Sequence, residues 1–242
     1  MRGPKAYIHL DHLVNNYHLV KNKVGQKRLV CVVKANAYGH GALECARTLY
    51  AAGCDYFAVF TVNEALDLRK GGINTEILVF NRLDENNLDL AVRRNLTLNI
   101  SHIDDLNILF KYKKKTGNCP PLHLKIDTGM TRLGISAGEA DTVLHKLALN
   151  RDINCLGIYS HLATADEGDL TFAYRQTEIF ENIKNKALEF GLKFKYYHLS
   201  NSGAVLNLDQ SNYNLVRVGM LLYGAFPSLE VERVMPFKPV ME

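Results

Sequence analysis

A lysine at the end of a short apolar run is the residue of this sequence best placed to do chemistry. Lys34 follows residues 30–33 (Val-Cys-Val-Val), whose three β-branched side chains predict a buried strand, and Tyr38 lies four residues farther on. A partly desolvated ε-amine loses proton affinity and can form a Schiff base with a carbonyl or with pyridoxal phosphate (PLP). The alternative is a strand-end lysine that extends into water, which is the commoner case for an isolated motif.

Other ionisable and polar side chains also fall in or just beyond apolar runs. Lys125 lies in the run 122–126 with Arg132 beyond it, and His161 follows the run 155–160. The remaining candidates lie after the run 196–199 and in or after the run 215–218; they are Asn201, Ser202, Arg217, Gly219 and Met220. Polar side chains inside apolar strands are costly unless they have partners, so this pattern predicts a ligand or a polar network.

The segments after the last two runs resemble the starts of two helices beside small residues. Ser202 opens one of them, and Gly219 and Met220 open the other. Two helix N-termini of this kind form an anion cradle that suits a phosphate group, although an ordinary N-cap is an equally common role for Ser202. No Walker or GxGxxG pattern is present, which favours a single phosphate over a nucleotide.

Three of these residues leave two interpretations open. A buried guanidinium cannot shed its proton, so Arg217 needs a partner, either in a structural ion pair or on the ring nitrogen of a cofactor. His161 could act as an acid or a base, but an orienting contact with Arg217 is favoured for a strand-end histidine. Lys125 shares a strand face with Asp127, so a plain salt bridge is one interpretation of it. Arg132 could form a bidentate pair with a substrate carboxylate.

Strand-like and helix-like segments alternate along the chain and would position these residues. The strand candidates are 29–33, 56–60, 76–80, 97–100, 122–126, 155–160, 196–199 and 215–218. The helix candidates are 42–51, 63–70, 85–94, 104–115, 137–149 and 172–190, preceded by a short strand at 6–10 and a helix that Asp11 caps and that runs to about residue 24. Eight strands over roughly 200 residues predict an α/β fold of the (β/α)8 (TIM barrel) type, with a doubly wound open sheet as the alternative. A barrel carries its active site where the strands end, which is where the candidate residues lie.

Composition is that of an ordinary globular protein. The chain has 242 residues, a hydrophobic content of 47%, a charged content of 22% and a net charge of +4. The charges are scattered, which argues against a nucleic-acid partner, and no stretch approaches the length of a membrane span. Five cysteines form no CxxC pair, so free thiols in the cytoplasm are expected rather than a disulfide framework or a zinc site, and no metal site is predicted.

These motifs resemble those of the alanine racemase family, specifically its PLP-binding barrel domain of fold type III, over about residues 5–240. Val32-Val-Lys-Ala-Asn-Ala-Tyr-Gly-His-Gly41 matches the PLP-lysine motif of that family and is highly specific. Further signatures follow in the same order along the chain: Lys125-Ile-Asp-Thr-Gly-Met-Thr-Arg-Leu-Gly134, Ser160-His-Leu-Ala-Thr-Ala-Asp166, Ser200-Asn-Ser202 and Val216-Arg-Val-Gly-Met220.

The resemblance implies a role for each candidate residue. Lys34 would carry the Schiff base and accept the proton on the D-alanine face. Tyr38, Ser202 and the backbone of Gly219 and Met220 would hold the phosphate, with Asn201 beside them. Arg217 would donate to the pyridine nitrogen with support from His161. Arg132 would position the substrate carboxylate, and Lys125, which is carbamylated in some members, would offset the charge of Arg132.

The resemblance departs from the family at the end of the chain. Complete members continue into a C-terminal β-domain that supplies a catalytic tyrosine to the partner subunit, and the segment 237–242 resembles the opening of that domain. The expected division is therefore an N-terminal strand at 1–10, the PLP-binding barrel at 11–228, and a linker with the start of a missing β-domain at 229–242. The full-length form is expected to be a homodimer, and the chain alone is expected to be impaired because the tyrosine is missing.

The sequence therefore predicts a barrel domain of a PLP-dependent amino-acid racemase that interconverts L-alanine and D-alanine. Racemisation requires acid/base groups on opposite sides of the cofactor, and this chain supplies Lys34 alone. One alternative is a non-catalytic single-domain barrel that stores or delivers PLP, against which the motifs at Lys34 and Arg132 argue. Another is a decarboxylase, or a racemase for a different amino acid, on the same barrel.

Overall fold

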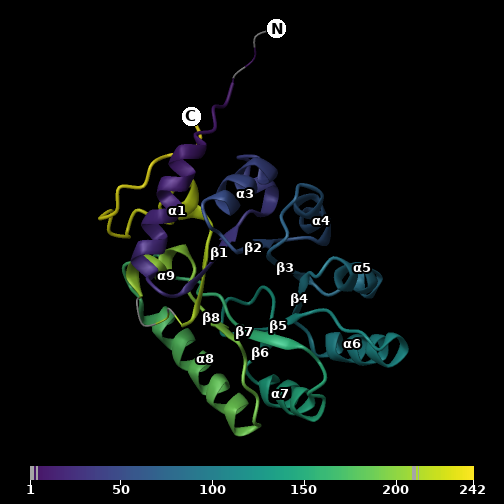
Figure 1. Cartoon of the computed structure of the whole chain (residues 1–242). Coiled ribbons are helices and arrows are strands. Elements are labelled where there is room, and N and C mark those ends of the chain that lie inside the picture. Colours follow the sequence, from purple (N-terminus) through teal and green to yellow (C-terminus); the bar gives the residue numbers. More distant parts are fainter. Residues whose placement is uncertain (1–2, 4, 209–210, 212) are drawn as a thin grey trace.

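The computed structural model describes residues 3, 5–208, 211 and 213–242, which form a closed ring of parallel strands surrounded by helices (Figure 1). In chain order the strands of the ring are β1 (Arg28–Val32), β2 (Tyr56–Val59), β3 (Glu76–Arg82), β4 (Thr97–Ile100), β5 (Leu122–Asp127), β7 (Cys155–Tyr159), β8 (Tyr196–His198) and β9 (Leu215–Val218). A two-residue strand, β6 (Ile135–Ser136), pairs with β5 outside the ring.

Closure of the ring excludes the open-sheet alternative. The strand order is β8-β7-β5-β4-β3-β2-β1-β9, with β1 paired in parallel to both β2 and β9. Between the two ends of this path, the N–H of Arg217 in β9 donates to the carbonyl of Ser200, just beyond β8, at 3.1 Å. The predicted (β/α)8 barrel is confirmed, and each predicted strand begins and ends within two residues of the observed one.

Helices cover the outside of the ring because one side of each strand is apolar and buried against them. They are α1 (Leu10–Val24), α3 (Ala42–Ala51), α4 (Val62–Lys70), α5 (Leu88–Arg93), α6 (Ile103–Thr116), α7 (Ala140–Leu149), α8 (Thr171–Glu189) and α9 (Ser202–Asn207), with 3-10 helices η1 (Glu85–Asn87) and η3 (Met220–Tyr223). The predicted helix 137–149 begins three residues late, at Ala140. Residues 135–136 form β6, and the Ser136 hydroxyl donates to the Glu139 carboxylate at 2.6 Å in the turn that follows.

The barrel interior is divided between an apolar half and a polar half. Alternate residues of β1 illustrate the division, because Val30 and Val32 face an inner cluster while Leu29 and Cys31 pack towards the helices. The inner apolar cluster is Val30, Val32, Tyr56, Ala58, Leu78, Tyr196 and Leu215. Strands β5, β8 and β9 instead contribute buried polar side chains, which lead towards the rim where the candidate residues lie.

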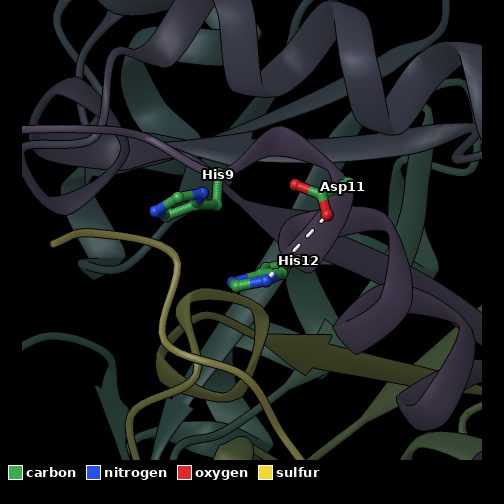
Figure 2. A group of neighbouring side chains, drawn as sticks. All are labelled: His9, Asp11 and His12. Carbon is green, nitrogen blue, oxygen red and sulfur yellow. Dashed lines mark ion pairs between the residues drawn. The ribbon is translucent and has the colours of Figure 1, made fainter.

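The N-terminal segment differs from the prediction. Residues 6–10 form no strand of their own; Ile8 makes a single antiparallel bridge to Met241. The N-cap position of α1 is His9, not Asp11, and Asp11 lies in the first turn next to His12 (Figure 2). Aspartate is favoured in a first turn because the N–H groups there are unpaired, and this signal is easily mistaken for a cap. Residues 1, 2 and 4 of the predicted strand lie outside the described residues.

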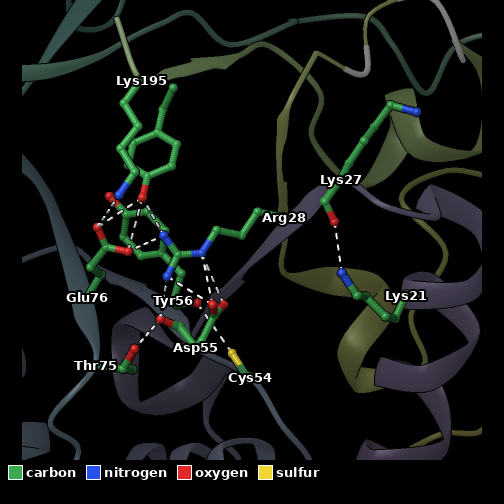
Figure 3. Close-up of polar contacts among 10 residues, drawn as sticks. Lys21, Lys27, Arg28, Cys54, Asp55, Tyr56, Thr75, Glu76 and Lys195 are labelled. Atoms are coloured by element: carbon green, nitrogen blue, oxygen red, sulfur yellow. Dashed lines mark hydrogen bonds and ion pairs between the residues drawn. The ribbon is translucent and has the colours of Figure 1, made fainter.

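A charged network closes the end of the barrel where the strands begin (Figure 3). Nε of Arg28 donates to both carboxylate oxygens of Asp55 at 3.2 and 3.1 Å, and its guanidinium also pairs with Glu76. The Tyr196 hydroxyl lies 3.1 Å from Oε1 of Glu76 and contacts Arg28 as well. The Arg28 guanidinium also stacks 4.9 Å above the Tyr56 ring, so this end of the interior is sealed by side chains rather than left as a pore.

Candidate active site

A cavity of about 420 Å³ opens where the strands of the barrel end. It is lined by all the residues that the sequence singled out as candidates: Lys34, Tyr38, Lys125, Arg132, His161, Asn201, Ser202, Arg217, Gly219 and Met220. These residues come from positions as far apart as 34 and 220 in the chain. The barrel topology therefore brings every sequence candidate to one cavity.

Lys34 begins a turn with unusual backbone geometry. After β1, Ala35, Asn36 and Ala37 have φ angles of 50°, 53° and 55°, the left-handed helical region that non-glycine residues rarely adopt in succession. Glu64 of α4 stabilises the turn by accepting the N–H of Ala35 at 2.6 Å, together with the N–H groups at the end of β2. The strained turn directs Lys34 towards the cavity and is held there by a neighbouring helix.

The environment of Lys34 lowers the proton affinity of its amine. Burial is the largest cause of its lowered pKa, and the positive charge of Arg132 adds to it. The Glu64 carboxylate acts in the opposite direction and raises the pKa. A lysine with a lowered pKa is neutral more often near neutral pH, which is what a base or a nucleophile requires.

Arg217 is buried in the polar half of the interior, with an exposed fraction of 3%. Its guanidinium donates to Nδ1 of His198 at 2.8 Å and to the Ser160 carbonyl at 2.7 Å, and it lies 3.3 Å from Nδ1 of His161. Burial lowers the pKa of Arg217 to about 10, which still leaves it protonated at neutral pH. In the part of the chain that the structure describes, the contacts of the Arg217 guanidinium are imidazole nitrogens and backbone carbonyls rather than a carboxylate, so the structural ion pair considered for it is not formed.

His161 contacts Arg217, as the orienting role that the sequence favoured for it would require. Burial and the charge of Arg217 hold the pKa of His161 well below its usual range, so the imidazole is neutral. A neutral Nδ1 accepts a hydrogen bond from the guanidinium, which fixes the proton on Nε2. The same argument applies to His198, whose Nε2 then donates to Nδ1 of His123 at 2.9 Å, while Nε2 of His123 reaches the Tyr56 hydroxyl at 3.2 Å.

Lys125 lies deeper in the cavity than Lys34, with an exposed fraction of 6%. Burial, followed by the charges of Arg217 and Arg132, lowers the pKa of its amine to about 7. Asp127 does not form the salt bridge considered for it, because its Oδ1 accepts the N–H groups of Gly129 and Thr131 at 2.9 and 3.0 Å. The Asp127 carboxylate thus shapes the loop that carries Arg132, and among the described residues Lys125 forms no ion pair with a carboxylate.

Small residues and neutral polar side chains line the part of the cavity wall formed by the starts of α9 and η3. The N-cap of α9 is Asn201, whose Oδ1 accepts the N–H of Ala204 at 3.0 Å, so Ser202 is not the cap. The Ser202 hydroxyl instead accepts the N–H of Gly219 at 3.2 Å. A Cβ on Gly219 would lie 2.5 Å from the Tyr38 hydroxyl, so only glycine lets that hydroxyl approach the backbone there. The hydroxyls of Tyr38 and Ser202 and the N–H of Gly219 therefore lie close together at this wall, and such donors suit a phosphate group.

The sequence reasoning missed several residues that shape this site. Tyr159 lines the cavity, its ring stacks on His198 at 4.5 Å, and its hydroxyl donates to Asn99 at 3.0 Å. Glu64 and His123 were missed as well. A signal existed for Glu64, because Thr61 with Glu64 forms a capping box that is visible in the sequence. Tyr159, His123 and His198 could have been found only from the strand register, which places Tyr159 beside both Lys125 and His198.

Among the described residues, no helix combines the length and the apolar composition that crossing a bilayer requires.

The family model named "Alanine racemase, N-terminal domain" matches residues 8–227. Alanine racemase 2 of Caldanaerobacter subterraneus subsp. tengcongensis is 34% identical over 243 residues, covering 100% of this chain and 63% of that protein. Alanine racemase 1 of the same organism is 37% identical over 235 residues, which cover 96% of this chain and 61% of that protein. The chain thus spans less than two thirds of the length of these curated relatives.

The solved structures that this chain resembles are also alanine racemases. The alanine racemase of Clostridium difficile 630 in complex with cycloserine superposes with a TM-score of 0.93 at 32% identity, over 98% of this chain and 66% of that one. The alanine racemase of Bacillus anthracis with bound L-Ala-P superposes with a TM-score of 0.89 at 29% identity, over 99% of this chain and 64% of that one. With the matched family model, these likenesses show that the chain belongs to the alanine racemase family and contains its N-terminal barrel domain.

Proposed function

We propose that this barrel binds PLP and carries the lysine half of a racemase that interconverts L-alanine and D-alanine. The observation that carries the proposal is the composition of the cavity. Four basic side chains, those of Lys34, Lys125, Arg132 and Arg217, line it together with the carboxylate of Asp166, so basic groups outnumber acidic ones in its lining. A ligand with a phosphate and a carboxylate matches such a site, because both groups are anionic.

The residues present fit PLP. Tyr38, Ser202 and the backbone of Gly219 and Met220 would hold the phosphate at the wall of hydroxyl and N–H groups. Asn201 would support this wall, since its Nδ2 donates to the Leu162 carbonyl at 3.0 Å and its Oδ1 caps α9. A guanidinium that remains protonated supports Arg217 as the donor to the pyridine nitrogen, with His161 orienting it.

The bound cofactor would withdraw electrons from the α-carbon of the amino acid and so make its α-proton acidic. The side chains of this barrel would then handle that proton and the substrate. Lys34, whose pKa is lowered, would take the α-proton on one face and return it. Arg132 would bind the substrate carboxylate, because a guanidinium offers two parallel donors to it. Lys34 and Arg132 are therefore the proposed catalytic residues.

Net racemisation needs a second acid or base on the opposite face. Tyr38 is a poor candidate, because burial raises the pKa of its hydroxyl to about 12, and His161 already accepts from Arg217. We propose that this group comes from the part of the family's length that the chain does not match, within a homodimer. In that proposal residues 11–228 form the PLP-binding barrel and residues 229–242 connect it to a β-domain. Free cysteines, all five of them described, are consistent with a cytoplasmic protein.

The experiment follows the α-proton of alanine. Each enantiomer is incubated separately in deuterated water with the 242-residue chain and saturating PLP, and both deuterium incorporation and optical purity are measured. We expect slow incorporation into alanine with slower loss of optical purity. Lys34→Ala should reduce incorporation by about 10²–10⁴-fold, the usual worth of a positioned acid or base. Lys70→Ala, at an exposed site on α4, is the matched control and should leave the rate unchanged.

Four results would contradict the proposal. Incorporation that survives Lys34→Ala removes the proposed base. PLP binding with no exchange on any amino acid favours the alternative of a PLP carrier, and exchange on another amino acid but not on alanine changes the substrate. Racemisation by this chain alone at an ordinary turnover, on the order of ten per second, places the second base within the barrel.

A further inference from the structure

Two histidines and an aspartate meet at the start of α1, among residues that do not line the active-site cavity. One ligand atom from each of His9, Asp11 and His12 lies within 4.8 Å of the others (Figure 2). The imidazole rings of His9 and His12 stack with their centroids 4.8 Å apart. Nothing in the proposed racemase chemistry uses these side chains.

The hydrogen bond made by His12 leaves one of its nitrogens free to bind a metal. Nδ1 of His12 lies 2.7 Å from the carbonyl oxygen of Pro239. A carbonyl oxygen only accepts, so Nδ1 carries the proton and Nε2 holds a lone pair. Nε2 lies 3.9 Å from Oδ2 of Asp11. A backbone carbonyl that fixes the far nitrogen of an imidazole is the usual outer contact of a metal-ligating histidine.

A second carboxylate lies beside His9. Oε2 of Glu242 is 3.1 Å from Nε2 of His9. The side chains of His9 and His12 are 36% and 28% exposed, so an ion can reach them from solvent. Two imidazoles with one or two carboxylates are a donor set for tetrahedral zinc, whereas calcium and magnesium prefer oxygen ligands alone.

We infer that His9, Asp11 and His12, with Glu242 as a further donor, form a site for a divalent transition metal, and that zinc fits it best. The site joins two segments from opposite ends of the chain. Backbone hydrogen bonds already pair them, with the N–H of Tyr7 donating to the Glu242 carbonyl at 2.8 Å and the N–H of His9 donating to the Val240 carbonyl at 2.8 Å. A bound ion therefore holds the segment 239–242 against α1. This inference departs from the prediction that the chain has no metal site, which considered only cysteine spacing.

The test measures zinc binding by the untagged 242-residue chain after treatment with a chelator. Isothermal titration with zinc chloride should show one site, and zinc should raise the melting temperature in a concentration-dependent manner. Loss of a residue that only contacts a metal ligand weakens metal binding roughly 10–100-fold. Because His9 and His12 would bind zinc directly, His9→Ala and His12→Ala should each weaken zinc binding by more than that. His18→Ala is the matched control, because His18 is an exposed histidine of the same helix outside the cluster.

Cobalt(II) in place of zinc identifies the donor atoms. Nitrogen and oxygen ligands give weak visible bands without the near-ultraviolet charge transfer of cobalt–thiolate sites, and the visible bands should vanish in His12→Ala. The inference fails if zinc binds His9→Ala and His12→Ala as tightly as the parent chain, or if thiolate charge transfer shows that cysteines hold the metal. It also fails if the parent chain binds no zinc. PLP absorbance, measured in parallel, separates each of these outcomes from failure of the proposed function.

Discussion

Burial in the cavity changes the protonation state of Lys125, which makes its amine available for a reaction. With a pKa of about 7, a large share of its amine is neutral at physiological pH. A neutral amine attacks carbon dioxide, forming a nitrogen–carbon bond and releasing one proton, and the carbamate so formed is negative. Its surroundings favour that charge, because Arg132 and Arg217 both act on Lys125 electrostatically.

We therefore predict that Lys125 forms a carbamate in bicarbonate buffer. Carbon-13 NMR in labelled bicarbonate should show one carbamate signal that is absent from Lys125→Ala and retained in Lys70→Ala. The exposed Lys70 is the control, because its side chain lies on the surface and pairs with Asp67 there. An identical spectrum for the parent chain and Lys125→Ala would refute the prediction.

A second prediction concerns stability against pH without bicarbonate. The pKa of Lys125 is about 7 in the folded chain, whereas the ordinary value of 10.5 applies to the unfolded chain. Above pH 7 the unfolded state therefore binds more protons at this residue than the folded state does. The free energy of unfolding should then rise with pH, by at most about 1.4 kcal/mol per unit from this group. Lys125→Met should flatten that rise between about pH 7 and 8.5 in urea denaturation. Above about pH 9 the buried thiols, such as Cys155 with its raised pKa, act in the opposite direction.

At the residue scale, the sequence predicted which side chains meet but not how they are partnered. The candidates could be found because strand ends of a barrel converge, which places Lys34 and Arg217 in one cavity without any knowledge of rotamers. The absence of a salt bridge between Lys125 and Asp127 could not be predicted, because both lie on one strand face. The loop N–H groups that capture Asp127 depend on the positive φ of Gly129 and Thr131.

At the scale of elements, the left-handed turn after β1 depends on α4. Glu64 in α4 accepts three backbone N–H groups, those of Ala35, Phe60 and Thr61. A glutamine offers a single acceptor oxygen, so Glu64→Gln leaves part of this set unpaired and also removes the carboxylate that raises the pKa of Lys34.

We predict that Glu64→Gln lowers the free energy of unfolding by about 1–2 kcal/mol, because backbone N–H groups lose their acceptor. PLP binding should weaken severalfold, because the turn that carries Lys34 becomes less firmly held. Urea denaturation and a PLP titration measure the two effects. Glu44→Gln, an exposed glutamate in the first turn of α3, should change neither. A normal PLP affinity in Glu64→Gln would show that the turn is held by other contacts.

The network at the opposite end of the barrel makes a different prediction. Arg28 joins β1 to Asp55, Glu76 and Tyr196, so Arg28→Met should cost about 1–3 kcal/mol of stability, the worth of hydrogen bonds to charged groups. PLP affinity should not change, because this network seals the end of the barrel away from the cavity. Arg47→Met, which breaks an exposed pair with Glu44, is the control and should cost less than about 1 kcal/mol.

Elements were predictable where a strong periodic pattern met a clear boundary, as at 42–51 and 97–100. They were not predictable where a hydrogen bond from a side chain to the backbone altered the local helix geometry. The helix expected at 85–94 is divided into η1 and α5, because Asp84 caps a 3-10 turn through the N–H of Asn86. The turn at 34–38 could not be foreseen, because its φ angles are unfavourable for Ala35 in isolation and depend on a glutamate far along the chain.

At the scale of the whole molecule, the order of strands follows from alternating strands and helices with right-handed crossovers. Closure between β8 and β9 completes the ring and converts scattered strand-end residues into a single cavity. The pairing of residues 7–9 with residues 240–242 was not predictable, because it joins short segments from opposite ends of the chain. That pairing is also what assembles His9, His12 and Glu242.

The proposed function depends above all on the attachment of PLP to Lys34. The most direct measurement is borohydride reduction of the chain loaded with PLP, followed by proteolysis and mass spectrometry of every lysine-containing peptide. We expect one pyridoxyl-modified peptide, containing Lys34, at near-stoichiometric yield, and its loss in Lys34→Ala. Stoichiometric modification of Lys125 or of surface lysines, or a yield unchanged in Lys34→Ala, would contradict it.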